Sequence, residues 1–458
     1  MPWATSRSSV AALAIFGALI AAATLLAMNP VAQRWSGDVP LLGEQARLML
    51  TGRHDESLFL SWYPPLALVP LGLPLLAGSG PTYAFALAAE MAAVAAIGAY
   101  GVAGAGRASG STSRDLLLYG ALLLATAALV VWRYDILPAV LMLGAIWGAT
   151  ARRWTAAGIT LGLAAGLKVF AIFLIPVFAV HAWRTGGNAA LVRFLSSVAI
   201  AGLVSLGAYL IFPGATPLDL LAFTANRPLQ IESVPGSVMV LLGALGMSSV
   251  EVSFGSFSFN LVGDAATAAP GVLRLLQLPV LLGTLTLGSV AVWRAGRSRG
   301  ATLVVAVVAA LLALLVTNPV LSTQYVIWVL PLAPLLPAWV RWPLVGAIGL
   351  TALLFPWLYS GLVELEPLPA VVLVARNGLL LVAWIAALIW LVVASARDQR
   401  SSDERPGEQD GRPVMDPEIR DGGHARQDGR ADGGWPAQRQ GQDDDPDEQP
   451  QAAAPELP

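Results

Sequence analysis

The feature that most constrains this fold is a succession of long apolar runs between the N-terminus and about residue 396. An α-helix rises about 1.5 Å per residue, so about 20 apolar residues cross the hydrocarbon core of a bilayer. Inside lipid each segment must satisfy its own backbone hydrogen bonds, and no strand alternation is evident, so helices are expected. The runs lie at about 10–28, 64–79, 82–103, 115–132, 136–150, 155–167, 169–183, 193–212, 271–293, 301–317, 324–340, 343–360 and 368–396.

We therefore expect an all-α polytopic membrane protein in which residues 1–396 form about 11–13 transmembrane helices. The run at 10–28 is longer than the apolar part of a usual signal peptide, so it is interpreted as a retained first helix. Only 12% of the residues are charged, compared with about a quarter in soluble domains. This composition agrees with a membrane protein.

Arginines in short loops predict which ends of the helices face the cytoplasm. The resulting orientation places two larger loops, at about 31–62 and 213–270, on the outer side. The run at 64–79, rich in Pro and Gly, is then expected to be re-entrant or juxtamembrane, since a full crossing there would put Arg107 and Arg114 outside. The arginines assigned to the cytoplasm are Arg152, Arg153, Arg184, Arg193, Arg294, Arg297, Arg299, Arg341 and Arg397.

The C-terminal segment 397–458 differs from the rest of the chain in charge. It holds 8 Arg and 16 Asp plus Glu, and Trp435 is almost its only large apolar residue. Such a segment cannot bury enough apolar surface to fold, so we expect a disordered acidic cytoplasmic tail. The chain has no cysteine and three histidines, which excludes disulfides and thiolate metal sites and makes a histidine-based metal site improbable. No nucleic-acid partner is expected.

The first outer loop contains Asp38, which lies about ten residues beyond the first apolar run, on a segment that must return to Tyr63. A carboxylate that is partly desolvated at a membrane surface can act as a general base for an acceptor hydroxyl. It could equally be a solvated loop acid, or the N-cap of a helix over 41–50. The neighbouring acids Glu44, Asp55 and Glu56 fit an ordinary role better, because Arg47, Arg53 and His54 are near enough to pair with them.

Three charged residues stand at junctions between apolar runs. Arg133 and Asp135 have almost no loop around them, and charges at such depth usually face a polar cavity; alternatively they pair with each other. Lys168 is the only lysine of the chain. Near the outer end of its helix, it could neutralise a lipid phosphate or extend to the headgroups.

Two further polar clusters lie in outer segments. Arg227, Gln230 and Glu232 bring a cation, an amide and a carboxylate together, a set that suits sugar hydroxyls or a diphosphate but also a self-satisfied turn. Gln324 and Tyr325 follow Ser322 and Thr323 and combine neutral hydrogen-bonding groups with an aromatic face, as carbohydrate sites often do; helix capping by Ser322 or Thr323 is the ordinary alternative.

The order of these residues along the chain resembles the glycosyltransferase C (GT-C) superfamily over roughly residues 10–395. The closest likeness is to the actinobacterial family 87-like polyprenyl-phosphate-mannose-dependent mannosyltransferases. The resemblance rests on Asp38, Tyr63-Pro64-Pro65-Leu66, Arg133-Tyr134-Asp135-x-x-Pro138, Gly162-Leu163-Ala164-Ala165-Gly166-Leu167-Lys168, Gln230-Ile231-Glu232-Ser233 and Ser322-Thr323-Gln324-Tyr325-x-x-Trp328-x-x-Pro331.

The resemblance implies a GT-C-like helical bundle in the plasma membrane. Its active site would face outward and transfer a sugar, with mannose favoured, from a polyprenyl-phosphate carrier to a glycolipid or glycan, with inversion. By analogy Asp38 is the base, Lys168 and Arg227 hold the carrier phosphate, and Gln324 and Tyr325 line the sugar pocket. No obligatory cofactor is implied, since the first loop has no Asp-x-Asp motif; a divalent ion bridging Asp38 and Glu232 would be compatible.

Two other classes of function are compatible with the same residues. The first is a transporter or flippase for a lipid-linked glycan, in which Arg133, Asp135 and Glu90 would line one translocation path. The second is a membrane scaffold whose acidic tail recruits a partner. The three hypotheses differ in which side chains must share a cavity and in whether the tail is needed.

Overall fold

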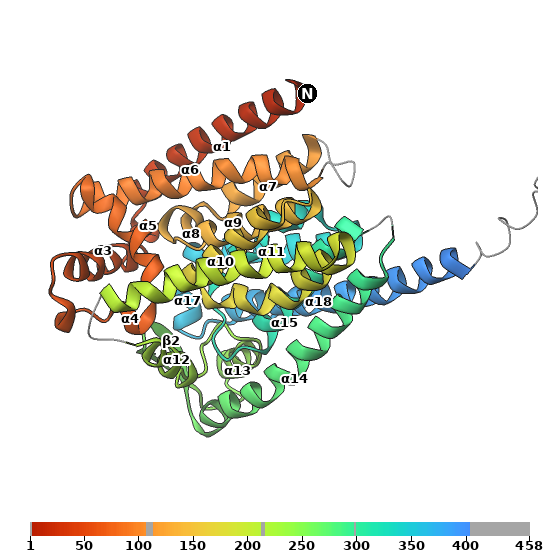
Figure 1. Cartoon of the computed structure of the whole chain (residues 1–458). Coiled ribbons are helices and arrows are strands. Elements are labelled where there is room, and N and C mark those ends of the chain that lie inside the picture. The colour runs from red at the N-terminus through yellow and green to blue at the C-terminus, as the bar shows by residue number, and fades with distance from the viewer. Residues whose placement is uncertain (1, 107–112, 212–215, 297–298, 404–458) are drawn as a thin grey trace, which may run out of the picture. The chain divides into compact units, whose positions relative to one another are not determined.

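The computed structural model describes residues 2–106, 113–211, 216–296 and 299–403, and the described chain is almost entirely helical (Figure 1). Seven helices of the described residues are long and apolar enough to cross a membrane, which agrees with the expected helical polytopic membrane protein. The exact number of crossings stays a prediction. The seven segments are Arg7–Met28, Pro81–Gly106, Val169–Ile211, Asp264–Arg294, Arg299–Thr317, Ala338–Val363 and Pro367–Ala396.

In the N-terminal half, α6 packs against α1, and both contact α7 and α8. Helix α10 packs on both α9 and α11. Helix α11 contains a kink at Gly187, between the predicted runs 169–183 and 193–212. The elements here are α1 Pro2–Met28, α2 Pro30–Arg34, α3 Asp38–Leu50, η1 His54–Glu56, α4 Phe59–Trp62, η2 Pro65–Ala67, α5 Leu68–Gly72, η3 Leu73–Leu76, α6 Pro81–Gly106, α7 Ser113–Ala125, α8 Ala127–Trp132, α9 Ile136–Thr150, α10 Trp154–Leu167, η5 Val169–Leu174 and α11 Ile175–Ile211.

In the C-terminal half, α15 is the most enclosed span, buried from Thr302 to Val316 and packed by α14 and α18. Helix α18 ends at Asp403, and the rest of the predicted tail lies outside the described residues. The elements here are α12 Pro217–Ala225, α13 Val234–Ala244, β1 Glu251–Gly255, β2 Ser258–Val262, α14 Asp264–Arg294, α15 Arg299–Thr317, η6 Thr323–Trp328, η7 Leu330–Leu335, α16 Ala338–Leu353, η8 Leu354–Leu358, α17 Tyr359–Val363 and α18 Pro367–Asp403.

A row of glycines brings α10 against α11. Gly158, Gly162 and Gly166 recur every four residues and therefore share one face of the helix. A Cβ added at Gly162 would lie 2.6 Å from the Cβ of Ala201, closer than two methyl groups can approach. Small residues at this spacing allow helices in a membrane to pack closely. The contact sets the position of the C-terminal end of α10, where Lys168 follows.

Two helices break at charged residues. Arg133 follows α8 and Lys168 follows α10, and both have extended backbones, with φ of −134° and −147°. A break frees backbone groups that lipid cannot satisfy. Here the carbonyl of Leu167 accepts a hydrogen bond from the Tyr134 hydroxyl at 3.2 Å, so a residue beside the first break satisfies a backbone group at the second.

The loop predicted at about 213–270, called the second outer loop after its predicted side, contains a β-hairpin, so the expectation that strands are absent is wrong at this point. β1 and β2 pair antiparallel with Glu251 opposite Val262, and the turn residues Ser256 and Phe257 have φ of 51° and 57°. Positive φ at both central residues is the conformation of tight hairpin turns. The loop also contains α12 and α13, and it ends earlier than predicted, because α14 begins at Asp264.

The segment Pro65–Leu76, within the predicted run 64–79, is divided among η2, α5 and η3. Its twelve residues would span about 18 Å as an α-helix, less than the roughly 30 Å hydrocarbon core. A single helix over this segment would therefore be too short to cross the bilayer. The re-entrant or juxtamembrane placement stays a prediction.

Candidate functional site

A cavity of about 530 Å³ lies where the first outer loop, the two helix breaks and the second outer loop meet. Every predicted site residue lines it except Asp135 and Glu232, which lie behind its wall. The predicted residues on the wall are Asp38, Tyr63, Arg133, Lys168, Arg227, Gln230, Gln324 and Tyr325. Segments far apart in the sequence therefore contribute their polar side chains to one hollow.

Asp38 is held at the cavity by Arg133. Asp38 Oδ2 lies 2.7 Å from Arg133 Nη2, and the Asp38 side chain is 61% exposed whereas that of Arg133 is 10% exposed. Asp38 is the first residue of α3, whose N-cap is Gly37 with no side-chain cap, so the N-cap interpretation is wrong. The interpretation of Arg133 and Asp135 as a mutual pair is also wrong, because each pairs with a residue from another segment. The result is a carboxylate that is fixed and still accessible.

Lys168 and Asp135 form a buried ion pair in the wall. Lys168 Nζ lies 3.0 Å from Asp135 Oδ1, with side-chain exposures of 14% and 2%, and Trp328 Nε1 donates to the same oxygen at 2.7 Å. Lys168 therefore does not extend to the headgroups. Its ammonium lies within 6 Å of the ring centroids of Tyr63, Tyr134, Tyr325 and Trp328, a distance at which aromatic rings attract a cation.

Arg227 contributes a third cation to the cavity, after Arg133 and Lys168, from the start of the second outer loop. Its Nη2 donates to the Ser258 hydroxyl on β2 at 2.8 Å, whereas its buried Nε has no hydrogen-bond partner. Arg274 on α14 also lines the cavity and donates to the Arg227 carbonyl at 2.7 Å. The hairpin thus positions the Arg227 guanidinium, and the Nε–H of that group remains without a hydrogen-bond acceptor.

Glu232 lies behind the wall and orients Gln230. Gln230 Nε2 donates to Glu232 Oε2, and the backbone N–H of Thr323 donates to Glu232 Oε1 at 3.1 Å. Burial raises the pKa of Glu232 to about 7, against the lowering effects of Arg376 and of the Thr323 hydrogen bond. This carboxyl group therefore titrates near neutral pH and connects the second outer loop to η6.

The segment with Gln324 and Tyr325 forms the aromatic side of the cavity. The Tyr325 ring stacks on Trp328 with centroids 4.3 Å apart, and Trp328 stacks on Phe170 at 3.9 Å. Gln324 lies at the cavity with its side chain partly exposed. Stacked rings beside amide groups provide the apolar and hydrogen-bonding surfaces that a sugar ring can contact.

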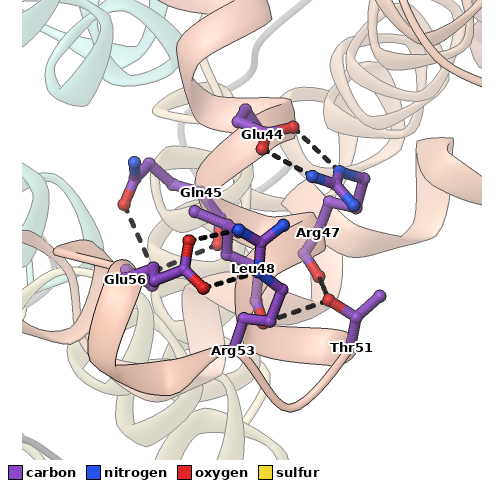
Figure 2. A network of polar contacts seen from close by, with 8 residues as sticks. Glu44, Gln45, Arg47, Leu48, Thr51, Arg53 and Glu56 are labelled. Carbon is purple, nitrogen blue, oxygen red and sulfur yellow. Dashed lines mark hydrogen bonds and ion pairs between the residues drawn. The ribbon is translucent and has the colours of Figure 1, made fainter.

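The remaining acids of the first outer loop do not line this cavity. Figure 2 shows Glu44 paired with Arg47, with 2.6 Å between Glu44 Oε1 and Arg47 Nη2, and Glu56 paired with Arg53. These exposed pairs confirm the ordinary role expected of Glu44 and Glu56. Between them the buried Gln45 accepts a hydrogen bond from the Leu58 N–H at 2.7 Å, which holds the loop together.

Several residues of the site were missed from the sequence. Arg274 lies near the start of the predicted apolar run 271–293, and Phe257 on the hairpin turn contacts Trp62 with centroids 3.9 Å apart. Arg376 is fully buried, donates to Asn377 Oδ1 at 2.8 Å and has an electrostatic effect on Glu232. A lone arginine inside an apolar run is a signal that could have identified Arg376.

The cavity combines an accessible carboxylate, four basic side chains and stacked aromatic rings. Within the described residues no group of three or more metal-ligating side chains occurs. Comparisons with protein-family models, with curated proteins and with solved structures returned no match.

Proposed function

We propose that this protein is a membrane glycosyltransferase that moves a sugar, with mannose favoured, from a polyprenyl-phosphate carrier to an extracytoplasmic glycolipid or glycan. The observation that supports this most is the Asp38–Arg133 pair, which fixes an exposed carboxylate in a cavity that also holds Lys168, Arg227 and Arg274. Such a cavity suits a substrate that has a phosphate, a sugar and an apolar chain.

In the proposed reaction Asp38 accepts the proton of the acceptor hydroxyl while that oxygen forms a bond to the anomeric carbon of the sugar. The bond between this carbon and the phosphate oxygen breaks, and its electron pair leaves with the phosphate. Attack from the face opposite the leaving group inverts the anomeric configuration. Cationic side chains around the departing phosphate stabilise its developing charge, a role that we give to Arg227 and Lys168.

The transport hypothesis is less well supported by the same cavity. It needs Arg133, Asp135 and Glu90 to line one continuous path. Arg133 lines the cavity, whereas Asp135 lies behind its wall and Glu90 is in the middle of α6, outside the lining. We therefore favour transfer at a fixed site over passage through the bundle.

Incorporation of labelled sugar from polyprenyl-phosphate donors into membrane lipids and glycans tests the proposal. We expect Asp38→Asn to lose about 10²–10⁴-fold in rate, the range that general-base catalysis contributes. Asp55→Asn is the matched control, because Asp55 is an exposed acid of the same loop that does not line the cavity. Thermal melting of each variant separates loss of chemistry from loss of fold. Full activity of a folded Asp38→Asn variant would exclude Asp38 as the base.

A further inference from the structure

A second hollow, of about 440 Å³, lies at the other end of α10 from the cavity. The fourteen residues of α10 separate the two by about 20 Å, and this end is the one predicted to face the cytoplasm. We call it the three-arginine pocket. It is lined by Arg152, Arg153, Trp154, Thr155, Ala156, Ile159 and Arg193.

The three arginines come from two separate segments. Arg152 and Arg153 form the turn between α9 and α10, and Arg193 lies on α11 after the Gly187 kink. All three are exposed, and in the described part of the chain none forms an ion pair with a carboxylate. Like charges that converge on one hollow repel each other, so an anion between them would be stabilised.

The backbone at this turn holds Arg152 in an unfavourable conformation. Helix α9 ends with Arg152 N–H bonded to the Ala149 carbonyl at 3.1 Å and Arg153 N–H bonded to the Gly148 carbonyl at 2.7 Å. These two hydrogen bonds form a Schellman motif, in which the residue after the helix C-cap has a left-handed backbone conformation and is usually glycine. That position is occupied here by Arg152, with φ of 57°. Arginine at a position that favours glycine indicates a use for its side chain.

The walls of the pocket indicate the kind of anion. Trp154 is buried at the base, whereas Ile159 is 41% exposed one turn further along α10. An apolar side chain beside three guanidinium groups, at the end of an apolar helix, matches a molecule with a phosphate at one end and acyl chains at the other. Arginine suits the phosphate because its planar fork donates two parallel hydrogen bonds.

We propose that the three-arginine pocket binds the phosphate of an anionic phospholipid headgroup, with the acyl chains passing along Ile159. Arginines that only determine membrane orientation would act through net charge and would not need to share a hollow. The proposal does not depend on glycosyl transfer, because the pocket and the cavity lie at opposite ends of α10.

Native mass spectrometry of the purified full-length chain in detergent can test this, with phosphatidylglycerol compared against phosphatidylcholine. We expect the wild type to retain phosphatidylglycerol, and Arg152→Gln/Arg193→Gln to retain less by at least about tenfold, because two arginines that can each donate charge-assisted hydrogen bonds are lost. The control Arg34→Gln/Arg294→Gln removes the same charge from exposed arginines outside the pocket and should retain as much as the wild type.

A second variant distinguishes loss of lipid binding from loss of the fold. Arg152→Gly suits the backbone at φ 57°, so it should fold at least as well as the wild type and still lose phosphatidylglycerol. Equal retention by the wild type and all variants would overturn the proposal. Displacement of the lipid by inorganic phosphate at equal concentration would assign the pocket to a free anion instead. Displacement by a peptide of residues 404–458 would assign it to the acidic tail.

Discussion

Asp135 Oδ1 lies 3.0 Å from Lys168 Nζ, and this pair connects two helix breaks at the wall of the cavity. Both side chains are largely buried, so each charge depends on the other for compensation. Trp328 donates to the same carboxylate oxygen, which ties η6 to the two breaks. The pair is therefore expected to organise the wall as well as to place a cation beside the cavity.

Breaking this pair should destabilise the protein. Lys168→Met or Asp135→Asn leaves one charge buried without its partner, which costs about 3–5 kcal/mol. The double variant should lose less than the sum of the two single variants, because neither charge remains. Thermal and denaturant unfolding in detergent measure this coupling. Glu44→Gln, which breaks an exposed pair, is the control and should unfold like the wild type; strictly additive losses would show that the two charges do not interact.

Glu232 should make stability depend on pH between about 4.5 and 7. Its pKa is raised to about 7 in the folded protein from 4.5, so the folded state holds the proton more tightly than the unfolded state. The stabilisation of the folded state by the protonated Glu232 carboxyl group is fully present below about pH 4.5. It is lost as pH rises through 7. As pH rises from about 4.5 to 7, the melting temperature should therefore fall less in Glu232→Gln than in the wild type. Identical pH profiles would contradict the assignment.

The glycine row between α10 and α11 should not tolerate a methyl group. Gly162→Ala would place a Cβ 2.6 Å from the Ala201 Cβ, and such overpacking costs about 1–3 kcal/mol. Gly202→Ala on α11 is the matched control, because nothing lies within 4 Å of an added Cβ there. Unfolding of the two variants in detergent measures the difference. A Gly162→Ala variant as stable as Gly202→Ala would mean that the helices can separate at little cost.

If the proposed function holds, Arg227→Gln should weaken binding of the proposed polyprenyl-phosphate donor. A hydrogen bond to a charged group contributes about 1.5–3 kcal/mol, which corresponds to a rise in KM of roughly tenfold to a hundredfold. Steady-state kinetics with varied donor concentration provide the measurement, and Arg34→Gln, an exposed arginine outside the cavity, is the control. A fall in kcat with unchanged KM would place the interaction in the transition state only.

The long apolar helices could be predicted from the sequence, because the length of an apolar run alone indicates them. The apolar run at 82–103 became α6, Pro81–Gly106, and the run at 301–317 became α15, Arg299–Thr317. Part of the candidate site could also be predicted, because charges such as Arg133 and Lys168 at junctions between spans must face something polar. The chemistry of these residues remains a prediction.

The pairing of the site residues could not be predicted, because it depends on which segments meet in the folded chain. Arg133 pairs with Asp38 and not with its neighbour Asp135, and nothing local in the sequence distinguishes the two. The hairpin had a signal that was overlooked: Val252 and Phe254, then Phe259 and Leu261, alternate with small or polar residues, as strands do.

The division of Pro65–Leu76 into three short pieces also affects the sidedness of the rest of the chain. A segment too short to cross returns the polypeptide to the membrane face at which it entered. If Pro65–Leu76 is re-entrant or juxtamembrane, as the sequence predicts, it adds apolar residues without changing the parity of the crossings. Counting it as a span would therefore assign every later loop to the opposite compartment.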